Sequence, residues 1–458
     1  MINDVSVIGL GKLGCTMAGC LASRGFNIIG VDVSQKAVNA LNAGHASAQE
    51  TGLDELIREN KQRLRATLNH EDAILNSDLS FVIVPTPSDE RGAFTIQYAA
   101  YAFEAIGKAL AKREKYHTVV LTSTVLPGST RYGLLPILEK FSGKQCGKDF
   151  GLCYSPEFIA LGTVIRDFLN PDFYLVGEFD KRSGATLESV NSRVALNQAP
   201  SKRMSIENAE LAKLSVNSFV TLKISYANML ADLCERIPGG DVDVVSDAIG
   251  LDKRIGRRYL TGGFGYGGPC FPRDNVALNF IGNYLGASTP LLEVNDNYNR
   301  TISPRFVDKL TPHLRKGATV AVLGLAYKPL SHVIEESGGI YLCLALSNRG
   351  FRVMGFDPLA TAEAYVALHM HALVSDSLAA CLQDAECILV TTPDEVFKSL
   401  KPEDFLAKKE SVTIVDFWRC LPDAIRAHPK IQYVPVGRCI DDTASVEKLR
   451  GLWNGDVG

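Results

Sequence analysis

The sequence lacks a strong excess of charge of either sign. Its 48 Lys and Arg residues nearly balance its 51 Asp and Glu residues, which leaves a formal net charge of −3. Proteins that hold nucleic acid or an anionic membrane surface usually carry a basic face. We therefore expect neither nucleic acid nor a membrane as a partner.

Long apolar runs and metal-ligand patterns are also missing. The apolar stretch 79–87 is far shorter than the ~20 residues that a membrane-spanning helix needs. Because Asp4 and a glycine-rich turn lie so close to the first methionine, we expect no signal peptide and a cytoplasmic protein. No HxxH or CxxC pattern occurs and the 8 histidines are scattered, so we expect neither a metal site nor a Ser-His triad.

What is present is enough chain for several hydrophobic cores. At roughly 100–200 residues per domain, a chain of 458 residues predicts two to four domains, with three as the central expectation. Apolar residues make up 46% and charged residues 22%, as in most globular proteins. The 11 cysteines favour reduced, buried side chains over a disulfide scaffold, although one of them could have a special chemical role.

Short β-branched or aromatic runs alternate with helical stretches in the first 200 residues, and the same alternation returns after residue 319. A single long helical pattern covers residues 205–237 between them. We predict an α/β protein with two doubly wound Rossmann-like domains, joined by a helical middle domain with a long central helix. The expected boundaries are 1–200, 201–300 and 301–458. The apolar content of the long helix also favours a homodimer or a higher homo-oligomer.

A glycine-rich turn joins the first predicted strand to the first predicted helix. Gly9, Gly11 and Gly14 have the spacing that permits a tight turn, close approach of a pyrophosphate and close packing of the helix on the strand. Asp32 ends the second strand, where an acid accepts hydrogen bonds from ribose hydroxyls and repels a 2′-phosphate. The pattern predicts NAD as the cofactor, with Lys12 and Leu13 beside it, although an ordinary strand–helix turn could carry the same glycines.

The second candidate site is the glycine-rich segment 262–274. Five glycines within residues 262–268 allow backbone mobility and close approach, and Cys270 and Asp274 follow directly. A nucleophilic cysteine needs access and a helix N-terminus or a cation that stabilises its thiolate. This setting favours a nucleophile at Cys270, and a buried loop cysteine is the alternative. The other ten cysteines lie mostly in apolar runs or helical patterns.

A third candidate is a polar pair on the long helix. Lys213 and Asn217 are four residues apart and share one helix face. Their ammonium and carboxamide groups could hold a sugar hydroxyl and stabilise a developing alkoxide, and a solvated helix face is an equal alternative. A fourth group of residues comes from three predicted strand ends, because ligand sites of parallel sheets lie at the carboxyl ends of strands, although each segment could equally be an ordinary β-turn. These are Pro85, Thr86, Thr124, Glu157 and Phe158.

In their order along almost the whole chain, these motifs resemble those of the UDP-glucose/GDP-mannose dehydrogenase family. The stretch 249–274 (IGLDKRIGRRYLTGGFGYGGPCFPRD) is similar to the family's catalytic-cysteine signature, and most similar to that of its UDP-glucose branch. Further matching motifs are VPTP at 84–87, STV at 123–125, SPEF at 155–158, FLNPD at 168–172, AELAKLSVN at 209–217 and LGLAYKP at 323–329.

The resemblance implies an NAD-dependent four-electron oxidation of the C6 hydroxyl of a nucleotide sugar, with UDP-glucose as the expected substrate. The alcohol would become an aldehyde, then a thiohemiacetal and a thioester on Cys270, and water would release the acid. Lys213 and Asn217 would stabilise the oxyanion, Asp274 and Thr124 would position water or relay a proton, and Glu157 would act in thioester hydrolysis. The cofactor residues implied are Gly9, Gly11, Lys12, Leu13, Gly14, Asp32, Pro85, Thr86 and Thr124. The substrate residues implied are Phe158, Lys213, Asn217, Arg254 (reaching the site of the partner subunit), Tyr259, Gly267 and Lys328.

Three positions depart from the family pattern. Leu161 stands where the family has a glutamate, Val333 where it has an aspartate, and Glu335 where it has an arginine that often contacts cofactor or ligand. The same chemistry on GDP-mannose, a UDP-N-acetylhexosamine or a dTDP-sugar therefore stays an alternative. A two-electron β-hydroxyacid dehydrogenase and a non-catalytic NAD-binding protein are more distant ones. The former lacks the glycine-rich cysteine loop, and the latter has no need of Cys270 with its polar neighbours.

Overall fold

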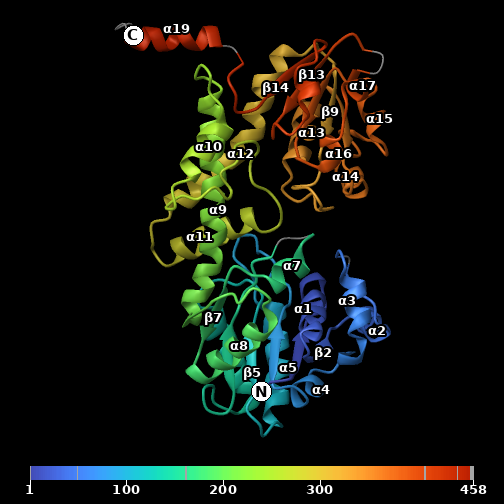
Figure 1. The fold of residues 1–458 in the computed structure, drawn as a ribbon. Helices are drawn as coiled ribbons and strands as arrows, with labels where there is room; N and C mark the ends of the chain where they lie inside the picture. Colours follow the sequence, from blue (N-terminus) through green and yellow to red (C-terminus); the bar gives the residue numbers. More distant parts are fainter. Residues whose placement is uncertain (1, 49, 160–161, 407–408, 441, 454–458) are drawn as a thin grey trace. The chain divides into compact units, whose positions relative to one another are not determined.

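The computed structural model describes residues 2–48, 50–159, 162–406, 409–440 and 442–453. The chain divides into two compact units, Met1–Val216 with Phe280–Ala287, and Asn217–Asn279 with Ser288–Gly458. Helix α9 (Ile206–Cys234) is continuous through the boundary between them (Figure 1). The single long helix predicted over 205–237 is thus confirmed, although it ends three residues earlier, at Cys234. The Ser205 hydroxyl caps its start by accepting from the Asn208 N–H.

The first unit is built on a sheet of eight described strands in the order β3-β2-β1-β4-β5-β6-β7-β8. Neighbouring strands pair in parallel, except β6 and β7, which are antiparallel. The order changes direction at β1, as in a doubly wound fold. The strands are β1 (Asp4–Ile8), β2 (Asn27–Val31), β3 (Leu64–Thr67), β4 (Leu79–Val82), β5 (Thr118–Leu121), β6 (Gly151–Tyr154), β7 (Tyr174–Glu178) and β8 (Ser201–Ser205).

Helices cover both faces of this sheet, so its central strands are buried on both sides. Val5 and Val7 of β1 pack into a core with α1, whereas Ile8 packs into a second core with α5. Strands buried on both faces read as continuous apolar runs, and that is why they could be found in the sequence. The helices are α1 (Lys12–Ser23), α2 (Gln35–Ala43), α3 (Leu53–Glu59), α4 (His70–Leu75), α5 (Gln97–Ala111), α6 (Leu135–Ser142), α7 (Val164–Leu169) and α8 (Lys181–Val194).

The second unit contains a parallel sheet of six described strands in the order β11-β10-β9-β12-β13-β14. Its strands are β9 (Thr319–Leu323), β10 (Arg352–Phe356), β11 (Leu373–Val374), β12 (Cys387–Val390), β13 (Val412–Asp416) and β14 (Ile431–Pro435). Its helices include α10 (Val242–Gly250), α12 (Pro290–Leu310), α13 (Gly338–Asn348), α14 (Thr361–Leu368), α15 (Leu378–Leu382) and α19 (Asp442–Trp453). Helix α11 (Phe271–Tyr284) begins in this unit, and its last turn, from Phe280, belongs to the first unit. Shorter helices are α16 (Glu395–Lys398), α17 (Pro402–Leu406) and α18 (Asp423–Arg426). Two doubly wound sheets with a helical stretch between them confirm the predicted α/β class.

Both sheets open with the same local structure. In each, the glycine after the first strand donates its N–H to the end of the second strand, and the next residue donates to the aspartate that follows. The pairs are Gly9 to Val31 (2.7 Å) and Leu10 to Asp32 (2.6 Å) in the first unit, and Gly324 to Phe356 (2.8 Å) and Leu325 to Asp357 (2.7 Å) in the second. The division into three parts at residues 200 and 300 stays a prediction.

No helix of the described ranges is both long and apolar enough to cross a membrane.

Candidate active site

The turn between β1 and α1 requires glycine at two of its three glycine positions. A Cβ atom at Gly9, where φ is +99°, would lie 2.0 Å from the Ile83 carbonyl oxygen, and one at Gly14 would lie 1.8 Å from the Gly9 oxygen. At Gly11, by contrast, a Cβ would meet no described atom within 4 Å. The backbone therefore borders open space at Gly11, which leaves room for a pyrophosphate.

The N-terminus of α1 faces this space. Gly11 is its N-cap, no described side chain caps the helix there, and its first turn holds no acidic residue. Unpaired N–H groups and the positive end of the helix dipole favour an anion. Lys12 and Leu13 form the first turn and are both partly exposed.

Asp32 lies beside the same turn, directly after β2. Its Oδ2 accepts from the Leu10 N–H at 2.6 Å and its Oδ1 from the Ser34 N–H at 2.8 Å. These two bonds fix the carboxylate at the end of the strand, where a ribose would lie. The open position at Gly11, the helix end and Asp32 thus fit NAD.

Two neighbouring strand ends are tied together on this sheet. The Thr86 hydroxyl, after β4, donates to the Thr124 carbonyl oxygen at 2.7 Å, after β5. The Ser123 hydroxyl accepts from the Val84 N–H at 2.8 Å and donates to the Val84 oxygen at 2.7 Å. Thr86 is buried, whereas Pro85 is exposed and Thr124 partly exposed. The structure therefore brings these three predicted cofactor residues to the same edge of the sheet.

Glu210 is a residue of this region that the sequence did not single out. From α9, its two carboxylate oxygens accept from the backbone N–H groups of Gly128 (2.5 Å) and Thr130 (2.9 Å), in the loop that follows Thr124. Burial raises the pKa of this carboxyl to about 7. Glu210 thus ties the helix that carries Lys213 to the loop after β5.

Lys213 and Glu157 meet in the first unit. The buried Lys213 ammonium donates to the Glu157 carbonyl oxygen at 2.6 Å and lies 4.4 Å from the centre of the Phe158 ring. Desolvation raises the pKa of the Glu157 carboxyl to about 7, although the charge of Lys213 acts in the opposite direction. A carboxyl that titrates near neutral pH is suited to accept and return a proton.

Cys270 differs from the other cysteines in its position. All eleven cysteines are in the described part of the chain, none is in a disulfide, and Cys270 alone is exposed, whereas eight are buried and two half-buried. Its carbonyl oxygen accepts from the Asp274 N–H at 2.8 Å, which places Cys270 at the N-terminal end of α11. A helix N-terminus stabilises a thiolate. Burial, in contrast, raises the pKa of thiols such as Cys20 and Cys387 to about 12, which keeps them protonated.

Asn217 and Asp274 lie close to this cysteine in the second unit. The Asn217 amide donates from Nδ2 to Oδ2 of the buried Asp274 at 2.6 Å, which links α9 to the first turn of α11. The predicted catalytic residues are therefore divided: Thr124, Glu157 and Lys213 belong to the first unit, and Asn217, Cys270 and Asp274 to the second. Lys213 and Asn217 are four residues apart in α9, so they lie one helical turn from each other on the same face.

The segment after β9 packs against the glycines before Cys270. A Cβ at Gly268, where φ is +82°, would lie 2.5 Å from the Tyr327 ring, and one at Gly267 would lie 2.1 Å from the Glu336 oxygen. Desolvation and the neighbouring Cys270 raise the pKa of Tyr327 to about 12. Lys328 follows directly and is partly exposed, with its ammonium 5.7 Å from the centre of the Tyr327 ring.

Arg254 and Tyr259 are both exposed. The Arg254 guanidinium pairs with Asp252 at 2.6 Å and is 88% exposed, and no described contact brings it to Cys270 of its own chain. Tyr259 has a positive φ of 65°, and its ring packs edge-on against Phe271, with centroids 6.4 Å apart. Tyr259 therefore does reach the segment that carries Cys270.

Glu335 and Val333, two of the three residues that depart from the family pattern, form hydrogen bonds here through their backbone oxygens. Glu335 presents its carbonyl oxygen to the Gly268 N–H at 3.0 Å while its side chain is exposed, and the Val333 oxygen accepts from the Tyr327 N–H at 3.0 Å. A changed side chain leaves such bonds in place. Leu161 lies outside the described residues. No described group of three or more His, Cys, Asp or Glu side chains is arranged to hold a metal ion.

Family models match this chain in three consecutive stretches. They are the NAD binding domain (residues 3–195), the central domain (207–301) and the UDP binding domain (321–423) of the UDP-glucose/GDP-mannose dehydrogenase family. The first of these indicates NAD as the cofactor, in agreement with the turn at Gly11, and the third indicates a nucleotide-sugar substrate.

Individual relatives cover nearly the whole chain. A UDP-glucose 6-dehydrogenase of Haloferax volcanii is 36% identical over 90% of this chain and 96% of its own. A GDP-mannose 6-dehydrogenase of Azotobacter vinelandii is 32% identical over the same shares. The solved structure of a UDP-glucose dehydrogenase from Pyrobaculum islandicum matches with a TM-score of 0.86 and 31% identity, over 96% of this chain and 98% of that one. The chain thus belongs to the UDP-glucose/GDP-mannose dehydrogenase family, whose members are NAD-dependent nucleotide-sugar dehydrogenases.

Proposed function

We propose that this protein is a UDP-glucose 6-dehydrogenase, which oxidises the C6 hydroxyl of UDP-glucose to the carboxylate of UDP-glucuronate. The observation that carries the proposal is the exposed Cys270 at the N-terminus of α11, next to the hydrogen-bonded Asn217 and Asp274. A nucleophile there can hold the substrate covalently between two oxidation steps. Balanced over both steps, the reaction consumes one water and two NAD⁺ and yields the acid, two NADH and protons.

The two polar residues of α9 are suited to the first oxidation. The ammonium of Lys213 and the carboxamide of Asn217 would hold the C6 oxygen while its proton leaves and charge develops on it. When bound at the turn after β1, NAD supplies the acceptor for one hydride in each oxidation step.

Cys270 would then form the covalent intermediates. Its thiolate adds to the C6 aldehyde to give a thiohemiacetal, and loss of a second hydride from C6 converts this to a thioester. Because the sugar stays bound to sulfur, no free aldehyde escapes between the steps. Glu157, with a pKa raised to about 7, is suited to take a proton from the water that attacks the thioester and releases the thiol. Asp274 would fix the Asn217 amide and help to place that water.

Recognition of the nucleotide is assigned to Lys328 and to the segment that contains Tyr259 and Gly267. Lys328 would face the diphosphate, since it is partly exposed and lies beside Tyr327, which packs on the cysteine loop. Phe158 would contact the sugar from the first unit. GDP-mannose is the second candidate substrate, because a GDP-mannose 6-dehydrogenase is 32% identical over 90% of this chain.

We also propose a homodimer or larger homo-oligomer. Helix α9 leaves large apolar side chains exposed, among them Phe219, Tyr226, Met229 and Leu233. An apolar row of this kind on one helix is typical of a subunit interface. Arg254, exposed in its own chain, would then contact substrate in the partner's site. Sedimentation of a fully active monomer would contradict this.

The function is tested by incubating the protein with NAD and a panel of nucleotide sugars. UDP-glucose should yield two NADH per sugar and the fastest turnover. A stoichiometry of one would exclude the thioester route. Faster turnover of GDP-mannose, a UDP-N-acetylhexosamine or a dTDP-sugar would replace the substrate and leave the chemistry in place.

A further inference from the structure

The cysteine loop, residues 262–270, is contacted closely at every one of its five glycines. In each case a Cβ atom would lie within 3.0 Å of a neighbouring atom, which real Cβ atoms essentially never do. The neighbours are Ala227 O for Gly262 (2.6 Å), Phe417 O for Gly263 (2.7 Å), Asn299 Oδ1 for Gly265 (2.4 Å), Glu336 O for Gly267 (2.1 Å) and the Tyr327 ring for Gly268 (2.5 Å). The glycines thus permit close approach of surrounding groups, which is one of the two properties that their spacing predicts. Backbone mobility is the other property and stays a prediction.

Two asparagine side chains supply backbone hydrogen bonds to this loop. Asn228 of α9, which is buried, accepts from the Gly263 N–H at Oδ1 and donates from Nδ2 to the Phe264 oxygen, both at 2.9 Å. Asn299 of α12 accepts from the Tyr266 N–H and donates to the Tyr266 oxygen, again both at 2.9 Å. Each carboxamide therefore provides the loop backbone with one hydrogen-bond acceptor and one donor, as the backbone of a paired β-strand does.

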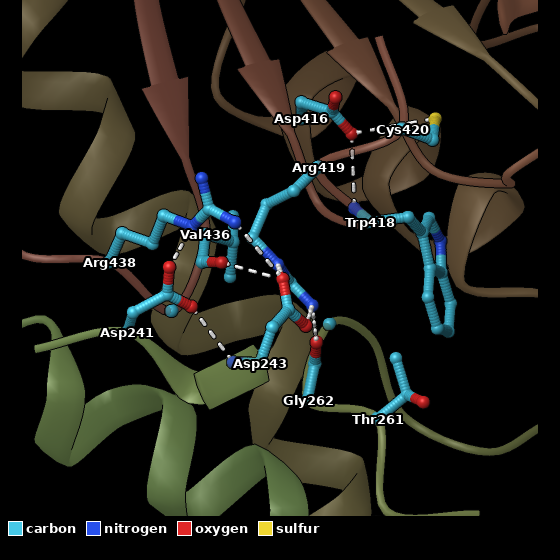
Figure 2. Close-up of polar contacts among 12 residues, drawn as sticks. Asp241, Asp243, Thr261, Gly262, Asp416, Trp418, Arg419, Cys420, Val436 and Arg438 are labelled. Carbon is cyan, nitrogen blue, oxygen red and sulfur yellow. Dashed lines mark hydrogen bonds and ion pairs between the residues drawn. The ribbon is translucent and has the colours of Figure 1, made fainter. Parts of the chain in front are cut away.

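A buried arginine holds the start of the same loop. Arg419, whose side chain is 1% exposed, donates to the Gly262 oxygen at 2.6 Å and forms a two-pronged ion pair with Asp243 at 2.7 and 2.8 Å (Figure 2). It also donates to the carbonyl oxygens of Phe417 (2.9 Å) and Val436 (2.7 Å). Gly262 is therefore attached to both α10 and the edge of the second sheet.

Tyr266 connects the cysteine loop to helix α11, which begins directly after Cys270. Its backbone is held by Asn299, and its hydroxyl accepts from Asn275 Nδ2 at 3.1 Å. Asn275 follows Asp274 in the first turn of α11. The loop is thereby fixed to the helix whose N-terminus faces the thiol.

We propose that Asn228 and Asn299 are positioning residues for Cys270, which hold the loop so that the thiol stays at the N-terminus of α11. For the overall reaction this inference rests on the proposed function, whereas the reactivity of the thiol is measured without any substrate. Loss of either amide removes two backbone hydrogen bonds from the loop. The backbone that leads into Cys270 then loosens, and the thiol no longer keeps one orientation at the helix end. Misplacement of a reacting group by about 1 Å lowers turnover by roughly a hundredfold.

The test compares Asn228→Ala and Asn299→Ala with Asn297→Ala, an exposed asparagine on the same α12 helix. Alkylation of Cys270 by iodoacetamide at pH 7, followed by mass spectrometry of its peptide, should slow by about threefold or more in the first two variants, because less thiolate is present. Their kcat should fall about tenfold or more while NAD binding stays close to the parent value and the variants remain folded at the assay temperature. Asn297→Ala should match the parent in every measurement.

Folded Asn228→Ala and Asn299→Ala variants that alkylate and turn over like the parent would overturn the proposal. If an alanine variant fails to fold, the aspartate variant of the same residue replaces it, Asn228→Asp or Asn299→Asp. Each keeps the shape of the side chain and can donate to the Phe264 or Tyr266 oxygen, respectively, only when protonated. The ratio of its alkylation rate to that of the parent should rise as the pH falls, and a constant ratio would overturn the proposal. Failure of the parent protein to oxidise UDP-glucose would remove the proposed function and leave the alkylation comparison intact.

Discussion

The ammonium of Lys213 and the carbonyl oxygen of Glu157 are 2.6 Å apart, so the lysine of α9 and the strand-end segment after β6 hold each other through a backbone contact. The Glu157 carboxyl is not consumed by this bond, because only its main-chain oxygen takes part. A base whose pKa is raised by desolvation thus lies beside a fixed positive charge.

For Glu157→Gln we expect thioester hydrolysis to slow by about a hundredfold, because the amide cannot take a proton from water. Oxidation up to the thioester should continue, so a burst of two NADH per active site should precede slow turnover. Stopped-flow absorbance at the NADH band measures this. The matched control is Glu90→Gln, an exposed glutamate of the same unit, which should behave as the parent.

The pH dependence of the parent should follow the same carboxyl. Its pKa is raised to about 7, so the protonated form predominates below that pH and cannot act as a base. We expect kcat to fall as the pH drops below about 7 and this limb to disappear in Glu157→Gln. An unchanged limb in the variant would assign it to another group.

Cys270→Ala should abolish formation of the acid while NAD binding, measured by quenching of protein fluorescence, is retained. The reason is that the cofactor turn lies in the first unit and contains no atom of Cys270. Cys439→Ala, at a half-buried cysteine of the second unit, is the control and should keep most activity. Full acid formation by Cys270→Ala would refute its role as nucleophile.

Asp32→Asn should weaken NAD binding by about tenfold, since hydrogen bonds to a charged acceptor contribute about 1.5–3 kcal/mol. It should also reduce the preference of the protein for NAD over NADP, because the charge that repels a 2′-phosphate is lost. Titration calorimetry with both dinucleotides measures the change. An equal loss for NAD and NADP would show that Asp32 acts only on the Gly9 turn, through the Leu10 bond.

Arg419→Met should lower the free energy of unfolding by about 3 kcal/mol, because it removes a buried guanidinium from the partly exposed Asp243 and leaves three backbone carbonyl oxygens without their donor. Burial opposes ionisation of Asp243, but the hydrogen bonds and charges of Arg419 and Arg438 outweigh it and hold the pKa of this carboxyl below its usual value. The contribution of Asp243 is therefore complete above about pH 4 and is lost as the pH falls through the lowered folded-state pKa. Urea unfolding of the parent, both single variants and Arg419→Met with Asp243→Asn isolates the pair, and additive effects would contradict the coupling.

Strands could be predicted where burial on both faces leaves an apolar run. The alternation that the pattern predicts after residue 319 is confirmed by strands such as β9 and β10, which lie inside the second sheet. The four strands that the pattern does not predict, β3, β8, β11 and β14, are the edge strands of the two sheets. Strand β8 has the polar, only partly buried sequence SKRMS, and β11 has two residues. Sequence pattern identifies strands in the interior of a sheet and fails at its edges.

The same contrast applies to the candidate site. Cys270 was found because glycine spacing is a local signal, whereas the contacts of Asn228 and Asn299 with the loop join residues 33 to 36 positions apart. No local pattern marks such asparagines. Arg419 follows β13 and so lies after the carboxyl end of a parallel strand, which is a position that sequence pattern can identify. The distribution of the catalytic residues over two units could not be foreseen, since only the folded chain shows which loops share a unit.

The two aspartates at the openings of the sheets have different surroundings. Asp357 is buried and accepts four backbone N–H groups, from Leu325 and Ala326 at Oδ2 and from Leu359 and Ala360 at Oδ1. Asp32 accepts two such groups and remains partly exposed. One acid thus keeps lone pairs for an incoming diol, and the other is saturated by its own main chain. The two sheets therefore have the same turn but differ in the function of one side chain. Asp32 can accept hydrogen bonds from a ribose, whereas Asp357 stabilises the backbone of its own unit.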